Sequence, residues 1–122
     1  MLTSEHIQRL VDIANAGCSK GHVVEARVIY QGLLATNPDL APASIGLALS
    51  HIVVNEFAEA EKLLRDTVLA AAPDDQEALA MLGLCHTLAG QREEAEAVLV
   101  PLADQDGPRA ELATALLERA RA

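Results

Sequence analysis

The feature of this sequence that most constrains its fold is a pattern of small and helix-breaking residues that occurs three times. Three alanines in similar surroundings lie 34 and 35 residues apart, three prolines lie 35 and 35 residues apart, and two histidines lie 35 residues apart in the same frame. A period of this size indicates a repeated supersecondary unit whose copies stack on one another. The residues that define the frame are Ala26, Ala60, Ala95, Pro38, Pro73, Pro108, His51 and His86.

Within each unit, apolar residues follow the spacing of an amphipathic helix. In the third unit, for example, Leu79, Leu82, Cys85 and Ala89 recur at intervals of three and four. The chain has one Phe, one Tyr and no Trp, so Ala, Leu and Val must fill the core, which suits closely packed helices. No apolar–polar alternation is sustained, so β-structure is not expected. We therefore expect pairs of helices, with breaks near Gly21, Pro38, Asn55, Pro73, Gly90 and Gly107.

The frame resembles the tetratricopeptide repeat (TPR). The third unit carries the fullest set of matching positions, namely Leu79, Leu82, Gly83, His86, Ala95, Leu99 and Pro108. The resemblance implies an all-α, right-handed superhelix of three TPR-like helix–turn–helix repeats plus a C-terminal capping helix. It also implies a single domain over residues 1–122, with repeats at about 7–40, 41–75 and 76–108 and a capping helix at about 109–121.

The charge and the cysteines exclude several classes of protein. The formal net charge is −9 and the nine Lys and Arg residues form no run, so we expect no nucleic-acid partner, since binding phosphates needs a concentrated basic surface. The N-terminus has no hydrophobic signal core and the apolar runs are too short for membrane insertion. Cys18 and Cys85 lie inside apolar helical patterns, which favours buried, reduced thiols. We therefore expect a cytoplasmic protein.

Catalytic chemistry is not expected. Cys85 and His86 are adjacent, but neighbouring residues on a helix point about 100° apart and cannot act as a nucleophile–base pair. His51 and His86 occupy equivalent places in successive units, and no metal-binding motif accompanies them, so we interpret both as structural histidines hydrogen-bonded between helices. No glycine loop for phosphate is present. We predict no catalytic residues, no metal site, no cofactor and no enzyme activity.

The resemblance also implies which residues line the concave surface of the superhelix. Most are apolar, which is what binding an amphipathic helix in a groove requires. Only Asn15 matches the polar set with which some family members hold a carboxylate of chaperone C-termini. The alternative is that these side chains pack on neighbouring helices or on a second copy of the chain. The predicted partner-binding residues are Val11, Asn15, Cys18, Ile45, Leu49, Ile52, Val53, Met81, Leu84 and Leu88.

The first unit resembles a narrower group, the TPR co-chaperones of bacterial type III secretion. The similar features are the Ala-Asn-Ala-Gly segment at 14–17, Glu25-Ala26, and an apolar second helix that ends near Leu34. The resemblance implies a cytoplasmic chaperone that holds an amphipathic helix of the self-assembling needle subunit, with a second small helical chaperone packed on the first repeat. The alternatives are a generic TPR scaffold or adaptor in another assembly, and a relative of a larger enzyme with an appended repeat domain.

Overall fold

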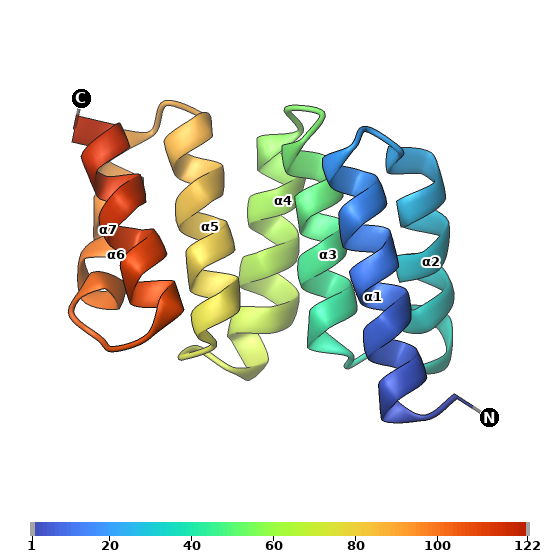
Figure 1. Ribbon diagram of the computed structural model, residues 1–122. Helices are drawn as coiled ribbons and strands as arrows, with labels where there is room; N and C mark the ends of the chain where they lie inside the picture. Colours follow the sequence, from blue (N-terminus) through green and yellow to red (C-terminus); the bar gives the residue numbers. More distant parts are fainter. Residues whose placement is uncertain (1, 122) are drawn as a thin grey trace.

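The computed structural model describes residues 2–121, which form seven helices and no β-strand (Figure 1). The prediction of an all-α, TPR-like helical repeat is confirmed. The helices pair into a first unit (α1–α2), a second unit (α3 with α4 and its π-helical continuation η1) and a third unit (α5–α6), followed by α7. Their bounds are α1 Ser4–Ser19, α2 Val23–Thr36, α3 Ala41–Ile52, α4 Phe57–Leu63, η1 Leu64–Leu69, α5 Gln76–Leu88, α6 Arg92–Ala103 and α7 Pro108–Arg121.

Short-range signals in the sequence set the ends of several helices. The Thr3 hydroxyl accepts a hydrogen bond from the His6 N–H at 3.2 Å, and this caps α1. The turns inside the three units pass through the left-handed region, at Gly21 (φ +92°), Asn55 (φ +64°) and Gly90 (φ +76°). Glycine and, less readily, asparagine adopt this conformation, which ends a helix and reverses the chain. The predicted breaks at these three residues are therefore confirmed.

The second helix of the second unit departs from regular α-helical hydrogen bonding in its second half. Twelve positions separate Ala26 from Pro38, whereas thirteen separate Ala60 from Pro73. In the second unit, α4 passes into η1, whose hydrogen bonds span one residue more than those of an α-helix. Leu64 and Val68 of this segment remain buried. Thirteen positions also separate Ala95 from Pro108, where α6 is α-helical, so the spacing alone does not account for η1.

Small residues allow the helices of each unit to approach closely. Ala14 meets Ala26 in the first unit and Ala48 meets Ala60 in the second, and all four are buried. Gly83 on α5 lies against Leu99 of α6, where an added Cβ would overlap the leucine side chain. The repeat positions that the sequence keeps small are therefore buried between helices, and at Gly83 no side chain would fit.

Candidate functional site

The first helices of the units form a continuous row. Helix α1 contacts α3, α3 contacts α5 and α5 contacts α7, whereas within residues 2–121 the second helices α2, α4 and α6 do not contact one another. When successive units contact one another through their first helices but not through their second helices, the stack curves so that the first helices line its concave side. We call the exposed side of α1, α3, α5 and α7 the inner face (Figure 1). It is the place where the sequence predicts a binding groove.

Four of the ten predicted groove residues do not line the inner face, because they are buried. Val11 packs with Leu33 and Ala43, where the first two units meet. Cys18 lies in the cluster that contains Tyr30. Ile45 and Ile52 belong to the core that joins the second and third units. All four are at most 3% exposed, so their prediction as accessible groove residues is corrected.

Asn15 is half-buried and already has a partner within the chain. Its side-chain oxygen accepts a hydrogen bond from the Tyr30 hydroxyl at 2.5 Å. Tyr30 is fully buried, so this bond satisfies a hydroxyl that would otherwise be desolvated without a partner. The side chain of Asn15 therefore holds the first unit together, a role that sequence reasoning did not assign to it.

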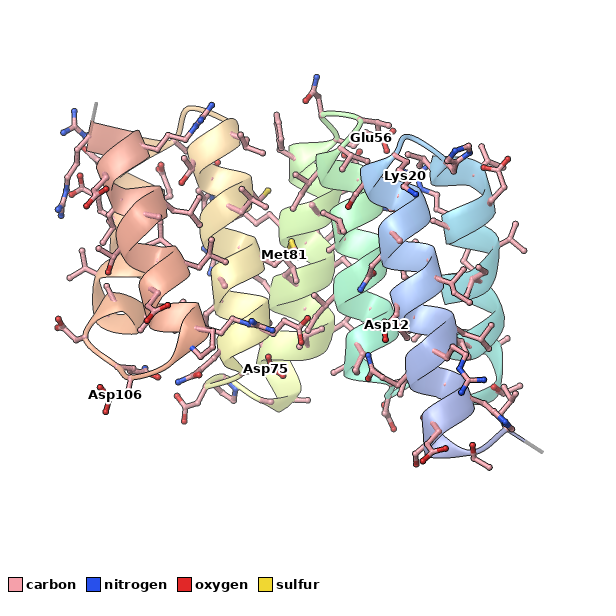
Figure 2. All side chains as sticks on the ribbon, viewed as in Figure 1. Asp12, Lys20, Glu56, Asp75, Met81 and Asp106 are labelled. Carbon is pink, nitrogen blue, oxygen red and sulfur yellow. The ribbon has the colours of Figure 1, made fainter. Side chains whose placement is uncertain are left out.

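The other five predicted residues keep surface that a partner could contact. Leu49, Met81 and Leu84 are half-buried, and Val53 and Leu88 are 41% and 45% exposed. Figure 2 labels Met81, which lies between α5 and α4 in that view. Three of the five come from α5, so the apolar surface is concentrated toward the C-terminal half of the row. Whether these residues bind a partner stays a prediction.

Sequence reasoning missed the contribution of α7. A pocket of about 190 Å³ lies between α5 and α7, and Leu112 is 44% exposed at its edge. The repeat frame predicts this position, because Leu112 lies 35 residues after Glu77, and the same spacing separates His86 from His51. The helix interpreted only as a cap thus extends the inner face. The pocket is lined by Glu77, Ala80, Met81, Leu84, Arg109 and Leu112.

The polar groups around this apolar surface leave acidic side chains accessible. Glu77 Oε1 lies 4.0 Å from Arg109 Nη2, a long and solvent-exposed ion pair at the edge of the pocket. On α1, Gln8 donates a hydrogen bond to Asp12 Oδ1 at 2.9 Å, and Asp12, labelled in Figure 2, is exposed. An inner face with apolar side chains on α5 and α7, an ion-paired carboxylate at the pocket and an exposed carboxylate on α1 suits a ligand that carries both apolar and basic residues.

The histidines and cysteines have structural surroundings. His51 Nδ1 lies 2.9 Å from Glu56 Oε1, and the buried His86 places its Nδ1 2.7 Å from Gln91 Oε1. Burial raises the pKa of the Cys85 thiol to about 11 and also raises that of Cys18, so both stay protonated and unreactive. Within residues 2–121, no three His, Cys, Asp or Glu side chains form a cluster suited to a metal ion.

Comparison with known proteins agrees with this architecture. Residues 66–120 match the family model described as tetratricopeptide repeat, a segment that runs from η1 through α5 and α6 into α7. No curated protein matches the sequence. Across residues 2–121, none of the helices is both long enough and apolar enough to span a membrane. The segment that matches includes the pocket between α5 and α7, and this half of the chain is therefore similar to proteins built from tetratricopeptide repeats.

Proposed function

We propose that this chain is a non-catalytic protein-interaction module that binds one amphipathic helix of a partner on its inner face. The observation that carries the proposal is the row of accessible apolar side chains on α5 and α7, at the position where helical repeats offer a binding surface. TPR-like repeats favour a protein ligand. A soluble surface that groups such side chains commonly serves an interaction.

The chemistry of the surface restricts the ligand. Met81, Leu84 and Leu112 meet at one pocket and can receive apolar side chains spaced along one face of a helix. Asp12 and Glu77 lie on helices of the same row, and the chain carries a net charge of −9. We therefore propose that the bound helix presents Leu-type residues to α5 and α7 and Lys or Arg residues on its flank.

The resemblance of the first unit names a specific partner of this type. The finer proposal is that the chain is a cytoplasmic chaperone that holds a type III secretion needle subunit apart from its copies, together with a second small helical chaperone. The alternative is a generic TPR scaffold. The position of the family match favours this alternative, because it lies in residues 66–120 and outside the unit that carries the narrower resemblance.

The test is a calorimetric titration with a basic amphipathic peptide of about 20 residues, since shorter isolated helices are marginal in water. A second arm uses the C-terminal helix of a needle subunit, and a third uses the first peptide with its sequence scrambled. We expect the amphipathic peptide to bind and the scrambled one not to. Clear preference for the needle peptide would support the chaperone, whereas equal binding of both helices would favour the generic scaffold.

A double substitution then locates the binding surface. Leu88→Asp with Leu112→Asp should weaken binding about a hundredfold, since each lost 1.4 kcal/mol is tenfold in affinity and burying a leucine contributes about 1.5–3 kcal/mol. Val100→Asp is the matched control, because Val100 is 40% exposed on α6, outside the inner row. Unchanged affinity in the folded double variant would mean that the peptide docks elsewhere.

A further inference from the structure

The exposed side of α2 differs from that of the other second helices. Val24 and Val28 are 73% and 65% exposed, the most exposed large hydrophobic side chains among residues 2–121. Glu25 is the one charged residue among the exposed positions of this helix. The exposed surface of α4 and η1, by contrast, carries Glu59, Lys62, Arg65 and Asp66. The exposed residues of α2 are Val24, Glu25, Val28, Gln31, Gly32, Ala35 and Thr36.

Helix α2 is also the outermost element at one end of the stack. It contacts α1 and α3 and no other helix, and Figure 1 shows its far side without a neighbour. Stacked repeats need a polar outer face at their ends to remain separate. The opposite end, on α7, has one, with Glu111, Glu118 and Arg119 exposed. The exposed side of α2 carries one charged residue, Glu25, beside the uncharged polar Gln31 and Thr36.

The distribution of charge indicates what could cover this surface. Residues 1–36 hold three acidic and three basic residues, so the entire net charge of −9 belongs to residues 37–122, which hold fifteen acidic and six basic residues. Two copies that met through the later units would bring like charges together. Two copies that met through α2 would join neutral ends and hold the acidic parts apart. The neutral α2 end is therefore the surface best suited to a second copy of this chain.

Gly32 suggests how two such helices would fit. A Cβ built at Gly32 meets nothing within 4 Å among residues 2–121, so no contact in this part of the chain requires a glycine in the middle of α2, where glycine weakens a helix. If two α2 helices pack antiparallel about a twofold axis near their midpoint, Val28 of one copy lies opposite Gly32 of the other. The missing side chain leaves room for the valine, and each Glu25 lies beside Ala35 rather than beside the other Glu25.

We propose that this protein forms a twofold homodimer through α2, with the helices antiparallel and Val28 of each copy packed over Gly32 of the other. One 14-residue helix from each copy makes a small interface. The dimer should therefore be weak, with dissociation measurable on the order of 1 µM to 1 mM, because interfaces below about 1,200 Å² belong to transient complexes. The inner face is on other helices and stays available to its ligand.

The test measures molar mass against concentration by sedimentation equilibrium or light scattering. The wild-type chain should move from 12.9 kDa toward twice that mass as its concentration rises. Val28→Glu should remain at 12.9 kDa throughout, because each carboxylate would be buried against the partner helix. Val100→Glu, a charge added to an exposed valine on α6, should dimerise like the wild type. Thermal melts of all variants confirm that they are folded.

Gly32→Leu tests the arrangement itself. The added side chain has open space within the chain, so the fold should melt no lower than the wild type, yet it should weaken the dimer at least tenfold by filling the place of Val28. Three results would overturn the proposal: a wild-type chain that stays monomeric, a dimer that Val28→Glu leaves intact, or a dimer that Gly32→Leu leaves intact. A wild-type chain that stayed monomeric and bound a different protein through α2 would count as the first of these results and would overturn the proposal.

Discussion

The two places where successive units meet use the same repeat frame but are held together by different interactions. Between the first and second units, α2 packs on α3 through buried apolar side chains such as Leu33 and Ala43 and through a polar network centred on Arg27. Its guanidinium donates to Ser50 Oγ at 2.9 Å and to Glu56 Oε1 at 2.8 Å, and also lies 3.1 Å from His51 Nδ1. Tyr30 packs beside this network against the backbone of Gly46, where any side chain would overlap the ring.

Between the second and third units, the joining surface is largely apolar. A buried cluster runs from α3 through α4 and η1 into α5, with Ala60, Leu64, Leu82 and Cys85 at its centre. The histidine equivalent to His51 is here the buried His86, and Glu61 Oε2 lies 3.5 Å from its Nε2. Arg65 reaches the same nitrogen at 3.4 Å, from a largely exposed position.

The difference shows how one repeat pattern can be stabilised in two ways. The position that holds Arg27 in the first unit holds Glu61 in the second, and the arginine of the second unit that approaches the next unit is Arg65, at a different position of the repeat. Both junctions bury apolar side chains, and the first adds directed hydrogen bonds from the partly buried Arg27. The stability of the polar junction should change when a charged group is removed or the pH is lowered. The stability of the apolar junction should change when a buried side chain is made smaller or replaced by a charged one.

The largest expected effect is at the apolar junction. Ala60→Glu places a carboxylate at a fully buried position between α3 and α4 with no partner, and should lower the free energy of unfolding by more than about 4 kcal/mol. Ala58→Glu, on the exposed side of the same helix, is the control and should change it by less than about 0.5 kcal/mol. Urea denaturation measures both. Equal midpoints for the two variants would mean that Ala60 is not part of the buried apolar cluster.

A smaller effect is expected at the polar junction. Arg27→Met keeps much of the side-chain volume but removes the hydrogen bonds to Ser50 and Glu56, and should cost about 1–3 kcal/mol because bonds to charged groups are lost. Arg65→Met is the matched change at the second junction, where the arginine is mostly exposed, and should cost less than about 1 kcal/mol. A larger cost at Arg65 than at Arg27 would contradict the contrast between the junctions.

The smallest effect concerns acid pH. Hydrogen bonds from His51 and Arg27 hold the pKa of the Glu56 carboxyl below its ordinary value of 4.5. A lowered pKa in the folded state means that Glu56 stabilises the protein above pH 4.5 and that this contribution is lost as the pH falls through the folded-state pKa. The wild type should therefore exceed Glu56→Gln in melting temperature at neutral pH, with the gap closing below pH 4.5. A gap that widened in acid would rule out this role.

Much of the fold could be predicted because it depends on short-range signals. Helical spacing, the Asp75 cap of α5 and the left-handed turns at Gly21, Asn55 and Gly90 each involve residues close together in the chain. The 35-residue period then aligns the units, so the small residues at Ala60 and Ala95 could be assigned to the core. Both are fully buried.

The inner face was harder to predict because it depends on how far each helix is rotated and how closely the units stack. A register taken from the repeat alone counted Val11 and Ile45 as accessible, although neighbouring units cover them. Long-range contacts could not be predicted from local patterns either, because Arg27 contacts Ser50 and Glu56, which lie 23 and 29 residues later in the chain. Leu112 was missed because α7 was treated as a cap, although the repeat frame continues into it.

The most direct test of the proposed function uses the methionines. The chain has two, Met1 and Met81, so labelling the methionine methyl groups with ¹³C gives two NMR signals, one of which comes from the inner face. Titration with the basic amphipathic peptide should shift the Met81 signal in step with the binding measured by calorimetry. The scrambled peptide should leave it in place. If the amphipathic peptide binds while the Met81 signal does not move, the inner face is not the binding site.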